Sequence, residues 1–131
     1  MLITKSIKSN PVASDGRRIS VMSRHTLSDG ITIDPEITSD MFDEWWPELS
    51  PPSLIIGAYY KRGLDWPKFE HAYNNHLQLP HIARKITDLI ELSQNQIVTV
   101  MCIENDPEQC HRRLLAEKCL LLSPGLEVKI T

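Results

Sequence analysis

The sequence predicts an α/β fold, a single three-layer domain over residues 1–131 in which helices flank a mainly parallel sheet. The main observation is segment 96–103, a nearly continuous apolar run rich in β-branched residues, as expected for an interior strand covered on both faces. A helical pattern over 107–122 and a short alternating segment over 126–130 follow it. Strand, helix and strand at this spacing are typical of a βαβ unit with a right-handed crossover. The length lies in the usual range for one domain.

The first third of the chain predicts two strands and a short helix. Residues 2–7 form the first expected strand, and the alternating segment 17–23 forms the second after a turn at 14–16. Helix-start residues from Asp34 to Ser39 then predict a short helix through Trp45.

The middle of the chain predicts a proline-rich connector followed by helices. Ser53 is the expected cap of a short helix over 54–60, although that segment is equally compatible with a strand. Two longer helices are expected to start near Asp65 and at Pro80. Their apolar faces, at helical spacing, are Phe69, Tyr73 and Leu77 in the first and Ile82, Ile86, Leu89 and Ile90 in the second.

Composition excludes several classes of protein. No run of about 18 apolar residues is present, so we expect no transmembrane helix and no membrane partner. The N-terminal apolar stretch is too short for a signal peptide. The three cysteines, an odd number without the regular spacing of a disulfide framework, favour a reducing cytoplasm. A net charge of −3 argues against broad nonspecific DNA binding. It leaves room for a local basic site formed by Arg17, Arg18, Arg24, Arg112 and Arg113.

The tripeptide Cys110-His111-Arg112 is the main candidate site. With Asp106 as the expected helix cap, Cys110 would lie in the first turn of the 107–122 helix. A helix N-terminus and neighbouring guanidinium groups favour thiolate, so we expect the pKa of Cys110 to fall from about 8.5 into a range of roughly 3.5 to 7.5. The same helix end and Arg112 would bind a phosphate. Glu104 is the expected general acid or base, or the group that orients His111.

A structural interpretation competes with this one. A cysteine in a helix is often a small buried apolar residue, and Arg112 and Arg113 would then pair with Glu108 and Glu117.

A second pair of candidates follows the second predicted strand. Arg24 and His25 lie just past the carboxyl end of that strand. Glu104 and Cys110 lie just past the carboxyl end of the strand expected over 96–103. If these two strands are parallel neighbours, their loops meet in one crevice, the usual ligand position in an open α/β sheet. Tyr73 would reach that crevice from a helix. The alternative is that Arg24 and His25 are ordinary loop residues.

We expect no cofactor and no metal from the sequence. His71, His76 and His81 recur every five residues, which does not place them on one helical face, and no paired carboxylates accompany them. Cys102 and Cys110 do not form a Cys-x-x-Cys pair, which gives little support to thioredoxin-type redox chemistry.

One segment resembles a known family. Residues 98–118, VTVMCIENDPEQCHRRLLAEK, are similar to the C-terminal signature of the YeaO-like proteins, domain-of-unknown-function family 488. Weaker similarities cover Ser14–Ile19, Trp45–Pro51 and Phe69–Tyr73. Residues 22–30 depart from the family pattern and align with confidence only at Arg24 and Gly30. The family has no established activity, so the resemblance implies a fold and a site but no reaction.

Three functions are compatible with these residues. The first is a small cytoplasmic enzyme acting on a phosphate-bearing substrate, a nucleotide or a nucleic-acid end. Arg112 and Arg24 would then hold the phosphate, while Cys110, Glu104 and His111 perform nucleophilic or acid–base steps. The second is a non-catalytic module that binds an anion or a partner with the same helix end. The third is a purely structural role for the tripeptide. The sequence predicts neither the substrate nor the oligomeric state.

Overall fold

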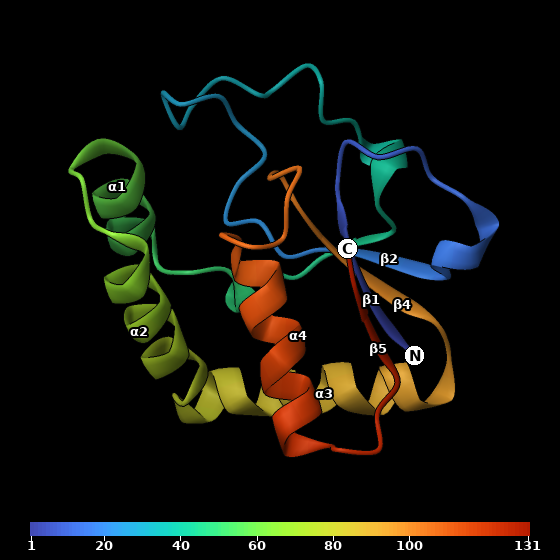
Figure 1. The fold of residues 1–131 in the computed structure, drawn as a ribbon. Helices are drawn as coiled ribbons and strands as arrows, with labels where there is room; N and C mark the ends of the chain where they lie inside the picture. Colours follow the sequence, from blue (N-terminus) through green and yellow to red (C-terminus); the bar gives the residue numbers. More distant parts are fainter.

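A computed structural model describes residues 1–131 as an α/β domain, which confirms the predicted fold class (Figure 1). Five parallel strands form one sheet in the order β3-β2-β4-β1-β5. The strands are β1 (Leu2–Ser6), β2 (Arg17–Ser20), β3 (Glu44–Trp45), β4 (Val98–Cys102) and β5 (Val128–Ile130). The α-helices are α1 (Ser53–Lys61), α2 (Trp66–Leu77), α3 (Pro80–Asn95) and α4 (His111–Leu122). No helix combines the length and the apolar character that crossing a membrane requires.

The sheet places β4 at its centre. All five residues of β4 are buried, as its β-branched apolar run predicts. β4 pairs with β2 on one side, where Ser20 lies opposite Met101, and with β1 on the other, where Ser6 lies opposite Cys102. The two strands that the sequence analysis required to be parallel neighbours are therefore adjacent, and their carboxyl ends meet.

The helices cover one face of this sheet. Residues of α2, α3 and α4 pack with strand residues in one apolar cluster that includes Leu2, Ile19, Val98 and Val100. On the opposite face, the Thr99 hydroxyl donates to the Asp15 carbonyl at 2.7 Å. A short 3₁₀ helix (Ala13–Asp15) and connecting loops cover that face (Figure 1). The α/β class and the parallel sheet are therefore as predicted, but the expected three-layer arrangement lacks its second layer of α-helices.

The two long helices form as their periodicity predicts. The Asp65 carboxylate caps α2 by accepting from the Lys68 amide at 3.1 Å, and Pro67 occupies the first turn. All the predicted apolar-face residues are buried, namely Phe69, Tyr73 and Leu77 in α2 and Ile82, Ile86, Leu89 and Ile90 in α3.

Three local predictions are corrected. The helix expected through Trp45 is a 3₁₀ turn (Ser39–Met41) followed by β3, because the amides of Asp43 and Trp46 donate to carbonyls of β2 at 2.8 Å. Segment 54–60 is helical, with Pro52 rather than Ser53 as its cap. Helix α4 begins at His111, four residues later than expected.

Candidate functional site

A pocket of about 540 Å³ lies beyond the carboxyl ends of β2 and β4. Its lining joins the end of β4, the first residues of α4, the helix α1 and the loop after β2. Four of the predicted site residues line this pocket: Arg24, Glu104, Cys110 and His111. This is the crevice that the strand order predicts for a ligand.

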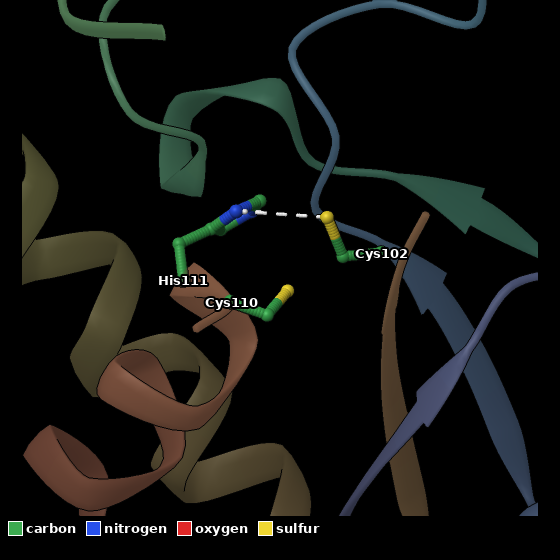
Figure 2. A group of neighbouring side chains, drawn as sticks. All are labelled: Cys102, Cys110 and His111. Carbon is green, nitrogen blue, oxygen red and sulfur yellow. Dashed lines mark hydrogen bonds between the residues drawn. The ribbon is translucent and has the colours of Figure 1, made fainter. Parts of the chain in front are cut away.

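Cys102, Cys110 and His111 are buried residues that line the pocket, and we call this group the pocket floor. Figure 2 shows the three side chains next to one another. Cys102 is the last residue of β4, Cys110 is the cap of α4, and His111 is the first residue of that helix. Cys102 Sγ lies 3.6 Å from His111 Nδ1, and the two sulfurs and a ring nitrogen all lie within 4.8 Å of one another. The side chains point toward one another from a strand end and a helix start, and all three residues are buried.

One hydrogen bond fixes the orientation of the His111 ring. His111 Nε2 lies 2.8 Å from the Val21 carbonyl oxygen, which can only accept, so Nε2 carries the hydrogen. Burial lowers the pKa of His111 and keeps the ring neutral. The lone pair on Nδ1 therefore faces Cys102.

The thiol pKa values differ from the prediction. The adjacent Cys102 and burial raise the pKa of Cys110, so the predicted lowering is wrong. The pKa of Cys102 is lowered, because Cys110 donates to its sulfur and further stabilisation comes from the Ile103 amide and the Arg112 charge. Of the two cysteines, Cys102 is therefore the one with the lowered pKa.

Arg112 does not face the pocket, contrary to the phosphate-binding prediction. Its side chain is fully buried, and every guanidinium nitrogen donates to the protein itself. Nη1 donates to the Glu104 carbonyl at 2.6 Å and to Cys110 Sγ at 3.3 Å. Nη2 donates to the carbonyls of Asn105 and Thr131 at 3.3 Å, and Nε also donates to Thr131. Arg112 therefore anchors the β4–α4 loop, while Arg113 pairs with Glu117 as in the structural interpretation.

Glu104 lies in the pocket beside an element that the sequence did not connect with the site. The Tyr60 hydroxyl donates to Glu104 Oε1, and burial together with that carboxylate raises the pKa of Tyr60. Next to it, the Tyr59 hydroxyl donates to Gln109 Oε1 at 3.1 Å. Both tyrosines belong to α1, whose assignment as helix or strand remained open in the sequence.

The remaining candidates separate into one that joins the site and two that do not. Arg24 is exposed and lines the pocket. His25 is half-buried outside the lining, 2.7 Å from Ser20 Oγ and packed against Phe42 and Trp45. Tyr73 is fully buried, and its hydroxyl donates to the Leu49 carbonyl at 2.6 Å. Its ring packs edge-on against His111 without reaching the pocket.

Two contributions to the site were missed in the sequence analysis. Cys102 was considered only as a partner in a redox motif, yet its position at the end of the central strand places it opposite the helix start. Lys61 and Arg62, at the end of α1, also line the pocket. The sequence feature that could have indicated them is the run of two tyrosines followed by two cationic residues, Tyr59 to Arg62.

Comparison with models of known protein families finds a match to most of the chain. A family model, DUF488-N3a, described as the active DUF488-N3 subclade, matches residues 2–122. No curated protein and no solved structure matched the chain. Because the matched segment covers nearly the whole chain, including both strands and the helix that form the pocket floor, the protein belongs to the DUF488 family.

Proposed function

We propose that this protein is an enzyme that acts on a phosphate-bearing substrate, a nucleotide or a nucleic-acid end, bound in the pocket above Cys102, Cys110 and His111. One observation carries the proposal: cationic side chains that form no salt bridge and a buried cysteine–histidine centre line the same pocket of about 540 Å³. This volume is within the range of about 300–1,000 Å³ that is usual for small-molecule sites.

The cations of the pocket support an anionic substrate. Arg24, Lys61 and Arg62 line it, and none of them forms a salt bridge in the described chain. Lys61 and Arg62 donate only to backbone carbonyls, those of Ser28 and Leu54. These side chains replace Arg112 as the proposed phosphate ligands.

The aromatic lining supports a substrate that also carries a planar group. Tyr59, Tyr60, Trp66 and Phe69 contribute to the pocket wall. Stacking of a nucleobase on an aromatic ring contributes about 1–3 kcal/mol. A nucleotide combines a phosphate with such a base, which is why we favour it over a simple inorganic anion.

The reactive centre distinguishes an enzyme from a binding module. Anion capture needs only the cations, whereas the convergence of two thiols and an oriented imidazole has no role in it. The description of the matched subclade as active supports catalysis. The three cysteines are free, which suits the reducing cytoplasm that we propose as the location.

A charge-reversal experiment tests the substrate class. Binding of nucleoside monophosphates and of inorganic phosphate is measured by calorimetry for the wild type and for the Lys61→Glu, Arg62→Glu double variant. We expect at least about tenfold weaker binding in this variant, from the loss of charge-assisted hydrogen bonds. Lys68→Glu with Arg84→Glu is the matched control, since both residues are exposed outside the pocket. Equal effects of the two double variants would contradict the proposal.

A second measurement separates catalysis from binding. Turnover of the nucleotides that bind is compared in the wild type, Cys102→Ala and Cys119→Ala. An enzyme loses turnover in Cys102→Ala while binding persists, and Cys119→Ala retains both. Binding without turnover in the wild type would identify the non-catalytic module.

A further inference from the structure

The three side chains at the pocket floor have the arrangement of a metal site. Cys102, Cys110 and His111 are 5%, 3% and 7% exposed, so the sulfurs and the imidazole are held away from bulk water. Two sulfurs and a neutral imidazole nitrogen are typical ligands of zinc. The histidines at 71, 76 and 81, which we considered from the sequence, take no part.

The separation of the donor atoms fits tetrahedral zinc. Zinc–sulfur and zinc–nitrogen bonds of about 2.3 Å and 2.05 Å at a tetrahedral angle place sulfur and nitrogen about 3.6 Å apart. The distance from Cys102 Sγ to His111 Nδ1 is 3.6 Å. The same geometry requires about 3.8 Å between two sulfurs. The three donor atoms lie within 4.8 Å of one another, so they need little movement.

Neighbouring groups already orient these ligands. His111 Nε2–H donates to the Val21 carbonyl, which leaves the lone pair of Nδ1 available to coordinate a metal. Histidine ligands of metals commonly make such a hydrogen bond with their other ring nitrogen. Arg112 Nη1 donates to Cys110 Sγ at 3.3 Å. A hydrogen bond of this kind stabilises a thiolate. Two thiolates and one Zn²⁺ also sum to zero charge, which removes the cost of burying two anions together.

We propose that Cys102, Cys110 and His111 bind one zinc ion, with a fourth coordination position open to the pocket. All three ligands line that pocket. Three protein ligands and one open position are characteristic of catalytic rather than structural zinc. The inference rests on the proposed function in one respect: the open position faces the space assigned to the substrate, where Glu104 also lies.

Metal content tests the inference directly. The full-length protein is purified under reducing conditions, and its zinc is measured by mass spectrometry. Cobalt(II) is then titrated into chelator-treated protein and followed by thiolate-to-cobalt charge-transfer absorption. We expect one metal ion per chain, with absorption typical of tetrahedral coordination. Cys102→Ala and Cys110→Ala are each expected to weaken binding at least about hundredfold, since removing even a supporting residue costs about 10–100-fold.

Two further variants make the test specific. Cys119→Ala is the matched control, because Cys119 is also buried and lies outside the cluster. It should bind metal as the wild type does. His111→Gln places an amide nitrogen where Nε2 donates its hydrogen to Val21, but it has no metal-binding nitrogen at the Nδ1 position. This variant should therefore lose the metal while remaining folded, as measured by circular dichroism.

The outcomes separate this inference from the proposed function. Stoichiometric metal that is lost only in the three ligand variants supports the site, whether or not nucleotides bind. Sub-stoichiometric metal in the wild type, or equal loss in Cys119→Ala, overturns it. In that case the calorimetric comparison of the Lys61 and Arg62 variants still decides the substrate class.

Discussion

At the residue scale, Arg112 ties three separate segments of the chain together. Its guanidinium donates to carbonyls at Glu104, Asn105 and Thr131 and to the sulfur of Cys110. A planar group with five N–H donors suits such a junction better than any other side chain. The motif that the sequence suggested for binding phosphate therefore fixes the loop that carries the candidate centre.

Replacing Arg112 should destabilise the fold. Arg112→Ala removes a fully buried side chain and leaves partly buried carbonyls without their donor. An acceptor that loses its donor costs about 1–3 kcal/mol, so with several of them we expect the free energy of unfolding to fall by about 3 kcal/mol or more. Arg113→Ala is the matched control at the next position, where the guanidinium donates to the Glu108 carbonyl and pairs with Glu117 and Glu70 in partly exposed surroundings. Exposed ion pairs contribute about 1 kcal/mol or less each, so we expect a smaller loss than in Arg112→Ala. Urea unfolding of both variants measures the difference. Equal losses would contradict the anchoring role of Arg112.

His25 gives a pH dependence to stability. Burial lowers its pKa in the folded state, while the unfolded chain keeps a value near 6.5. Between these two values the unfolded chain binds more protons, so stability rises with pH and is lost as pH falls below about 6.5. The loss between about pH 7.5 and pH 5.5 should be smaller in His25→Gln than in the wild type. His71→Gln, at an exposed position on α2, should retain the wild-type dependence.

At the element scale, a glycine determines how β2 enters the sheet. Gly16 precedes β2 with φ of 62°, a conformation that side chains disfavour. A Cβ at this position would lie 2.1 Å from the Ile97 carbonyl oxygen, and Arg17 donates to that same oxygen at 2.9 Å. Close approach of the two backbones is what aligns β2 with β4.

Gly16→Ala should therefore be strongly destabilising. The clash is with backbone, which cannot move without breaking the β2–β4 pairing, and the strained φ adds a cost of about 1–3 kcal/mol. We expect a loss of more than about 2 kcal/mol in thermal or urea unfolding. Gly125→Ala is the control, since no atom lies within 4 Å of a Cβ there and its φ is not positive. A small effect at Gly16 would contradict the packing argument.

The elements also show which structural features a sequence reveals. Helices α2 and α3 and strand β4 were predictable because periodicity and apolar runs are local properties. The start of α4 was not, because Asp106 Oδ1 accepts from the Glu108 amide in a local turn, and Cys110 becomes the cap. β3 was also missed, since its two residues form a strand only by pairing with β2.

At the scale of the whole molecule, the site depends on contacts between distant segments. The sequence placed Arg24, Glu104, Cys110 and His111 at one edge of the sheet, because strand order follows general rules. It did not predict the contact of Cys102 with His111, or of α1 with Glu104, because no local sequence pattern indicates contacts between such distant segments. The sequence also did not predict the burial of Arg112, because most of its acceptors are backbone carbonyls, one of them at Thr131.

The three cysteines provide a test of this whole arrangement. In chelator-treated, reduced protein, Cys102 should be alkylated fastest, because it lines the pocket and its pKa is lowered. Cys110 should react more slowly, since its pKa is raised.

Cys119 provides the reference for global unfolding. It is fully buried in the main core, where burial raises its pKa to about 12, so it should be labelled only when the whole domain unfolds. Gly16→Ala should accelerate labelling of Cys119 far more than that of Cys102, because pocket access does not require unfolding. Mass spectrometry at several urea concentrations resolves the three rates. Equal rates for Cys102 and Cys119 in the absence of denaturant would show that the pocket floor is closed to reagents, and would contradict a reactive centre at that position.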